Sequence, residues 1–167
     1  MNKVVSTLQR TARDAGLTTL RFNYRGTGAS EGRHDMGTGE VDDALAAAHW
    51  LRAKHPDLPI TLLGFSFGGF VAASLGGRLE AEGEALEHVF MIAPAVMRLR
   101  DEDALPHNGS LTVIQPETDE VIDPQRVYDW SQQLSRPHEL LKVAECGHFF
   151  HGKLTDLKDL VLPRLSN

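Results

Sequence analysis

The chain has 167 residues, of which 41% are apolar and 24% are charged. This length is enough for one globular domain with a buried core, and the apolar content is too high for a disordered chain. A formal net charge of −6, with Lys and Arg dispersed along the sequence, excludes the basic surface that binds nucleic acid or an anionic membrane. We therefore expect a single domain over residues 1–167 whose partner is a small-molecule substrate.

The sequence also argues against membrane, disulfide and metal-binding classes. Its longest apolar stretch, residues 89–97, is too short to span a bilayer, and no apolar core follows a basic start at the N-terminus. The single cysteine, Cys146, cannot form an internal disulfide, and no Cys or His cluster has the spacing of metal ligands. We expect a cytoplasmic protein with no metal and no cofactor, in which Cys146 fills a turn.

Apolar spacing predicts strands that alternate with helices. Helical periodicity and capping residues predict helices over residues 2–15, 38–54, about 67–79, from Pro124 onward, and about 153–162. Short apolar runs predict strands over residues 17–24, 60–63, 89–93, 111–114 and 140–143. The expected fold class is therefore α/β, with an open, mainly parallel sheet of about five strands and helices on both faces.

The motif Gly64-Phe65-Ser66-Phe67-Gly68 lies between the apolar run 60–63 and a predicted helix. A serine on a sharp strand-to-helix turn presents its hydroxyl at the carboxyl end of the strand. Glycines two positions on either side remove side chains that would collide there. The backbone N–H of Phe67, in the first turn of the helix, is available to bind an oxyanion. The motif predicts that Ser66 is a nucleophile.

A serine nucleophile needs a base to take its proton and an acid to orient that base. The loop after the run 111–114 offers three carboxylates, Glu117, Asp119 and Asp123. Asp123 precedes a proline and suits a helix cap, and Glu117 lies very close to the strand end. We therefore favour Asp119 as the acid.

Two histidines compete for the role of base, His148 and His151, in the loop after the run 140–143. His148 directly follows Gly147 at the strand's end, where an imidazole can reach back over Ser66. The carboxyl ends of parallel strands meet at one edge of a sheet, so this loop, the acid loop and Ser66 are expected to lie together. We favour His148 as the base.

A glycine-rich segment, residues 26–32, also follows a predicted strand. Its third glycine comes one residue too late for a dinucleotide-binding loop, and no helix begins directly after it. Arg25, just before this segment, is expected either to pair with a substrate anion or, more commonly for such an arginine, to form a structural ion pair.

With these motifs the sequence resembles the α/β-hydrolase superfamily, and within it the dienelactone-hydrolase-like predicted hydrolases. The resemblance covers nearly the whole chain, including residues 20–32, the Ser66 turn, the Asp119 loop and residues 147–152. It implies that Ser66 is the nucleophile, Asp119 the acid and His148 the base, with the Phe67 N–H in the oxyanion hole. One departure is Pro116, which stands where such hydrolases usually carry a glycine.

The resemblance implies a capless serine hydrolase that cleaves a small ester or thioester through an acyl-enzyme. Only about fifteen residues separate the runs that end at Ala93 and begin near Ser110, too few for a helical lid. The alternatives are a non-catalytic or incomplete hydrolase-like domain and, ranked lower, a serine peptidase.

The same resemblance predicts an N-terminally shortened chain. In the family, a strand and a loop with His-Pro and Gly-Gly elements precede the helix that matches residues 2–15, and that loop supplies a second oxyanion donor. We therefore expect this sequence, alone, to be poorly stable, self-associating or weakly active. The alternative is that the strands ending near Tyr24 and Ser66 pair directly, which leaves a compact five-stranded sheet with one backbone donor.

Overall fold

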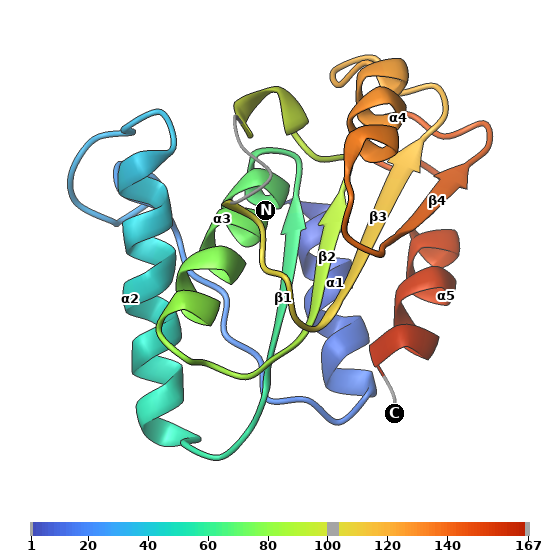
Figure 1. The fold of residues 1–167 in the computed structure, drawn as a ribbon. Coiled ribbons are helices and arrows are strands. Elements are labelled where there is room, and N and C mark those ends of the chain that lie inside the picture. The colour runs from blue at the N-terminus through green and yellow to red at the C-terminus, as the bar shows by residue number, and fades with distance from the viewer. Residues whose placement is uncertain (1, 100–103, 166–167) are drawn as a thin grey trace.

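The computed structural model describes residues 2–99 and 104–165, and four parallel strands form its sheet in the order β1-β2-β3-β4 (Figure 1). The strands are β1 (Ile60–Phe65), β2 (Leu86–Ile92), β3 (Ser110–Pro116) and β4 (Glu139–Val143). The helices are α1 (Lys3–Asp14), α2 (Thr38–Lys54), α3 (Phe67–Ala81), α4 (Pro124–Gln133) and α5 (Leu154–Leu165), with a short 3-10 helix, η1 (Val96–Arg98). The predicted α/β class with an open parallel sheet is confirmed.

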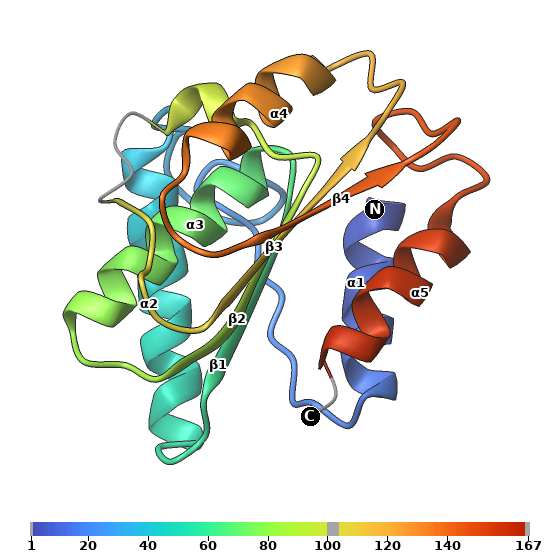
Figure 2. The same cartoon turned by 45° about the vertical axis from the view of Figure 1, so that its right-hand side comes forward.

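Helices cover both faces of the sheet, as predicted. Figure 2 shows α1 and α5 on one side of the strands and α3 and α4 on the other. Strand β2 supplies both cores, because alternate residues of a strand point to opposite faces. Phe90 and Ile92 pack with the residues of α1 and α5, whereas Val89 and Met91 pack with those of α3 and α4. This two-sided burial explains why the strand reads as a continuous apolar run.

Capping side chains start the helices where the sequence predicts. The Asn2 side-chain oxygen accepts hydrogen bonds from the N–H groups of Val4 at 2.9 Å and Val5 at 3.2 Å. The Asp123 carboxylate accepts one from the Gln125 N–H at 3.0 Å and so caps α4. Each bond satisfies an N–H that has no partner within its own helix.

The prediction of a strand over residues 17–24 is wrong. This segment has no strand hydrogen bonding, so the sheet has four strands rather than five, and the direct pairing with β1 that we considered does not form. A cavity of about 360 Å³ separates the segment from β1 and is also lined by α1 and α2. β-type residues form a strand only when a neighbouring backbone satisfies their N–H and C=O groups, and residues 17–24 have no such strand pairing.

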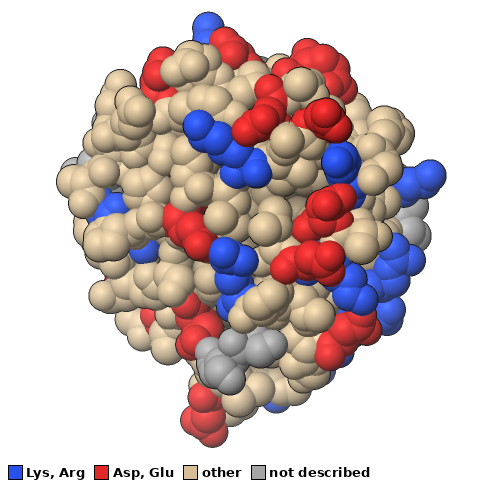
Figure 3. Space-filling view, turned by 90° about the vertical axis from the view of Figure 1, so that its right-hand side faces the viewer, with Lys and Arg blue, Asp and Glu red and all other residues tan. Residues whose placement is uncertain are grey.

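Charges of both signs are interspersed over the face shown in Figure 3, without a continuous basic surface. Helix α5 lies on this side and forms ion pairs with two other elements. Lys158 pairs with Asp14 at 2.9 Å and Arg164 with Glu139 at 2.6 Å. Within residues 2–99 and 104–165, no helix is long and apolar enough to cross a bilayer.

Candidate active site

Ser66 is held in a strained turn between β1 and α3. Its backbone φ of 58° and ψ of −116° are unusual for a residue with a side chain. The turn is fixed by two hydrogen bonds to the segment at the end of β2. The Ser66 N–H donates to the Ile92 carbonyl at 2.8 Å, and the Ala95 N–H donates to the Ser66 carbonyl at 3.1 Å. Strain of this kind persists only where the surroundings enforce it, and it is concentrated at functional sites.

The two glycines that flank Ser66 have different structural roles. A Cβ atom at Gly64 would lie 1.9 Å from the Gly68 carbonyl oxygen, so no side chain fits there. A Cβ atom at Gly68 would meet only the Tyr24 hydroxyl, at an ordinary 3.5 Å. At Gly69 the added atom would lie 2.9 Å from the Pro94 side chain. The expected steric need for glycine therefore applies to Gly64 and not to Gly68.

A continuous hydrogen-bonded chain joins Ser66, His148 and Asp119. The Ser66 Oγ lies 3.0 Å from His148 Nε2, and His148 Nδ1 lies 2.8 Å from Asp119 Oδ2. An ionised carboxylate can only accept, so Nδ1 carries the proton and Nε2 accepts from the serine hydroxyl. Both His148 and Asp119 are buried, whereas Ser66 is partly exposed.

The Asp119 carboxylate is surrounded by donors. Its Oδ1 accepts from the backbone N–H groups of Val121 at 2.8 Å and Ile122 at 2.7 Å. Burial alone would raise the pKa of Asp119, but the hydrogen bonds from His148 and from these two N–H groups hold it below the usual value. Asp119 therefore carries its negative charge at neutral pH. Pro116, at the end of β3, does not prevent this geometry.

The competing candidates lie elsewhere. Glu117 is exposed, and Asp123 caps α4. His151 is exposed, and the centre of its ring lies 6.4 Å from the centre of the Phe149 ring. Cys146 is completely buried, and burial raises the pKa of its thiol to about 11, so it is not an available nucleophile.

Two site residues were missed from the sequence. The Glu120 side chain accepts from the His148 backbone N–H at 3.1 Å and so fixes the loop that carries the imidazole. Gln115, the second-last residue of β3, donates from Nε2 to Asp119 Oδ2 at 3.2 Å. Glu120 could have been suspected from its place beside Asp119. Gln115 could not, because the apolar run 111–114 gives no signal that the polar residue after it is buried at the site.

Phe67 begins α3, so its backbone N–H lies beside Ser66 and has no partner within the helix. Its side chain packs edge-on against Tyr24 at 5.7 Å, and the Arg98 guanidinium lies 5.1 Å from its ring centre. Burial first, and then the negative charge of Glu40, raise the pKa of Tyr24 to about 12, so the phenol stays neutral.

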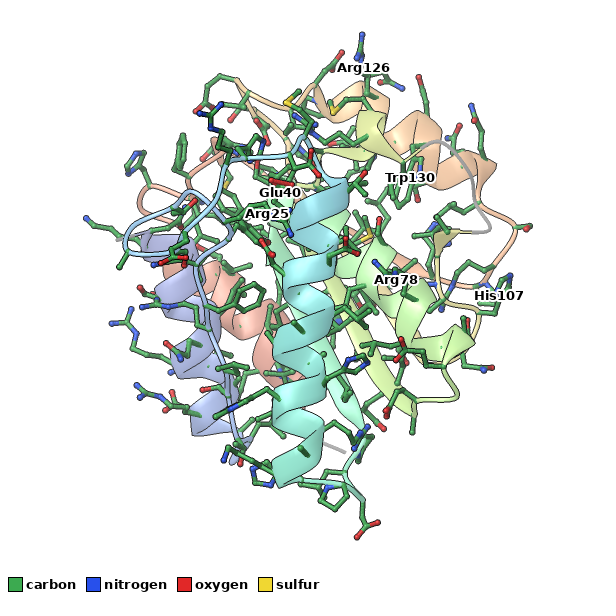
Figure 4. The ribbon with its side chains drawn as sticks, turned by 90° about the vertical axis from the view of Figure 1, so that its left-hand side faces the viewer. Arg25, Glu40, Arg78, His107, Arg126 and Trp130 are labelled. Atoms are coloured by element: carbon green, nitrogen blue, oxygen red, sulfur yellow. The ribbon has the colours of Figure 1, made fainter. Side chains whose placement is uncertain are left out.

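Arg25 forms the structural ion pair that we considered. Its guanidinium binds the Asp43 carboxylate, with Nη2 to Oδ1 at 2.8 Å, and its backbone N–H donates to Oδ2 at 2.9 Å. Figure 4 shows Arg25 and Glu40 beside the first turns of α2. These contacts tie the start of the glycine-rich segment to α2 and pair the charge of the guanidinium with Asp43.

Apolar side chains are exposed in three of the loops that follow strand ends. They are Met97 after β2, Val121 after β3 and Phe149 after β4, exposed by 47%, 56% and 47%. Although Met97 ends the apolar stretch 89–97, it does not lie in the core. The Phe149 ring stands edge-on to the His148 imidazole, with their centres 4.9 Å apart. Of these three side chains, Phe149 thus lies beside the imidazole that contacts Ser66.

A model of the thioesterase domain matches residues 29–136, a stretch that includes Ser66 and Asp119. The chain belongs to this family of α/β hydrolases. The solved α/β serine hydrolase homologue from Coxiella burnetii has 34% sequence identity and a TM-score of 0.87, over 99% of this chain and 77% of that one. The present chain is also similar to the α/β serine hydrolase without lid from Xanthomonas campestris, with 38% identity and a TM-score of 0.87.

The match to the Xanthomonas hydrolase covers 98% of this chain and 72% of the other. Among curated proteins, an uncharacterized protein from Rickettsia prowazekii is 32% identical over 171 residues, which span 96% of this chain and 69% of that protein. Together with the family match, the two solved structures show that this chain is a hydrolase of the α/β serine hydrolase type.

Proposed function

We propose that this α/β hydrolase cleaves a small carboxylic ester or thioester through an acyl-enzyme. Ser66 Oγ attacks the substrate carbonyl while His148 Nε2 accepts its proton, and the Phe67 N–H donates to the oxyanion that forms. His148 then protonates the leaving alcohol or thiol as the carbonyl bond to it breaks. Asp119 fixes the imidazole tautomer and stabilises the positive charge that develops on the ring.

Water releases the acyl group by the same route. It attacks the acyl-Ser66 carbonyl, gives a proton to His148, and this proton returns to Ser66 Oγ as the carboxylic acid leaves. The observation that supports the proposal best is the pair of distances that join the three side chains, 3.0 Å from Oγ to Nε2 and 2.8 Å from Nδ1 to Oδ2. No step requires a cofactor.

The apolar side chains of Met97, Val121 and Phe149 favour an apolar acyl group. The fewer than twenty residues between β2 and β3 favour an open, lidless site, as the Xanthomonas relative is described. Membership of the thioesterase-domain family favours a thioester substrate, from which a thiol is the leaving group.

The proposal is tested with nitrophenyl esters of increasing acyl length and the matching acyl thioesters. We expect turnover by the parent protein and a loss of about a millionfold in Ser66→Ala, because the three side chains act as a unit. His148→Ala should lose turnover as well, whereas His151→Ala should retain most of it. A folded parent protein that hydrolyses none of these substrates would favour the non-catalytic alternative, and cleavage of peptides alone would favour the peptidase.

A further inference from the structure

Gln115 is a fully buried polar residue near the carboxyl end of β3. Its Nε2 has two acceptors, Asp119 Oδ2 at 3.2 Å and the Pro116 carbonyl oxygen at 3.1 Å. Since both neighbours can only accept, the nitrogen of the amide must face them, and this fixes which way the side chain is turned. The amide therefore directs its N–H toward the carboxylate.

The other end of this amide lacks a partner. Gln115 Oε1 is buried, and none of the residues in 2–99 and 104–165 hydrogen-bonds to it. A buried acceptor without a partner destabilises the folded protein. An apolar side chain of similar size would avoid that cost but would also lose the two hydrogen bonds that Nε2 donates, so the two effects on stability oppose each other. Stability alone therefore does not explain a glutamine here.

The Asp119 carboxylate receives four hydrogen bonds, two at each oxygen. Backbone N–H groups occupy both acceptor positions of Oδ1, and the amide of Gln115 occupies one of the two at Oδ2. The remaining position of Oδ2 points to His148 Nδ1 at 2.8 Å. The contact with Gln115 thus limits rotation of the carboxylate and leaves Oδ2 a single direction in which to accept.

We propose that Gln115 is a positioning residue that holds the carboxylate of Asp119 in the orientation in which it binds the imidazole of His148. This inference rests on the proposed function for its kinetic consequence, although the contact itself does not. Gln115 is fully buried, and its amide hydrogen-bonds to Asp119 and Pro116, so it acts through Asp119 and not on the substrate.

The test compares Gln115→Met with the control Gln125→Met. Gln125 is an exposed residue of α4 that donates a hydrogen bond to Asp129 on the same helix, outside the site. In Gln115→Met we expect kcat for a nitrophenyl ester to fall about tenfold, the rate factor that corresponds to the free energy of about one hydrogen bond to a charged group. KM should change less than twofold. The melting temperature should change little, because the loss of the hydrogen bonds from Nε2 and the removal of the unpaired Oε1 have opposite effects on stability. The control should keep the parent values.

A second variant, Gln115→Glu, separates positioning from packing. Beside the Asp119 carboxylate, repulsion between like charges keeps the introduced carboxyl protonated, so it can donate to Oδ2 as the amide does. We expect its kcat at neutral pH to lie within about threefold of the parent. An unchanged kcat in Gln115→Met, or equal losses in both variants, would overturn the inference.

Proton NMR of the His148 Nδ1–H gives a readout that does not need turnover. We expect its resonance to be retained in the parent and in Gln125→Met and to broaden or shift in Gln115→Met. If the parent protein is inactive while this pattern holds, the proposed function fails and the positioning role stands. If the parent is active and Ser66-dependent but the resonance is unchanged in Gln115→Met, the positioning role fails alone.

Discussion

Replacement of Gly64 by alanine tests the steric basis of the Ser66 turn. The added Cβ would lie 1.9 Å from the Gly68 carbonyl oxygen and 2.4 Å from its carbon, whereas real Cβ atoms essentially never approach within 3.0 Å. Both contacts are backbone, so the strand and the helix must separate by about 1 Å. A displacement of that size at a reacting atom lowers turnover about a hundredfold. Overpacking should also destabilise the fold by about 1–3 kcal/mol.

Gly68→Ala is the matched control. Its Cβ would meet only the Tyr24 hydroxyl at 3.5 Å, and Gly68 lies within α3. Alanine in a helix is more stable than glycine by about 0.5–1 kcal/mol. We therefore expect Gly68→Ala to be at least as stable as the parent and to keep its activity within a few-fold. The assay is nitrophenyl ester turnover with a melting curve for each variant. Equal activity in Gly64→Ala and the parent would refute the steric reasoning.

Three further predictions concern pH, thiol reactivity and capping. The pKa of Asp119 is lowered in the folded protein; its contribution to stability is therefore present above the ordinary carboxyl value of about 4 and is lost as the pH falls through the lowered value. In urea unfolding, the stability gap between the parent and Asp119→Asn should narrow over that acid range, and a constant gap would contradict the assignment. Cys146 should resist thiol reagents in the folded protein and react once it is unfolded, because burial raises its pKa to about 11; rapid labelling under native conditions would contradict this. Asn2→Ala should lower the free energy of unfolding by about 1 kcal/mol, since two N–H groups of α1 lose their acceptor. An unchanged melting temperature would contradict this role of Asn2 as a cap.

Most of the fold follows from local sequence patterns. The apolar run from Val89 to Ile92 is buried on both faces of a parallel sheet, and this environment is what such a run predicts. The caps at Asn2 and Asp123 are equally local, because each side chain bonds N–H groups two or three residues away. Features of this kind depend on neighbours in the sequence, so they can be predicted from it.

The errors concern contacts between distant parts of the chain. Residues 17–24 have the composition of a strand, but a strand also needs a neighbouring backbone, which the sequence does not specify. Met97 is an apolar residue of a type that is usually buried, but it lies after the end of β2, in η1, where its side chain is exposed. The single rule that flanking glycines relieve collisions also fails to distinguish Gly64 from Gly68, since only the folded turn shows which Cβ would clash.

The sequence predicts the part of the candidate site that depends on the order of strands and loops along the chain. It does not predict the side-chain contacts that support this part. Each of Ser66, Asp119 and His148 lies in a loop after a predicted strand, and the fold brings these three loops together. The support that Gln115 and Glu120 give to Asp119 and His148 depends on side-chain directions within β3 and its loop. No spacing rule in the sequence encodes those directions.

The most direct test of the proposed nucleophile is reaction with a fluorophosphonate, read by mass spectrometry of the intact protein and of its peptides. We expect one adduct per chain, located on the peptide that contains Ser66, with no adduct in Ser66→Ala and slower labelling in His148→Ala. The His151→Ala variant should be labelled at the parent rate. A folded parent protein that remains unlabelled, or an adduct on another residue, would contradict the assignment of Ser66 as the nucleophile.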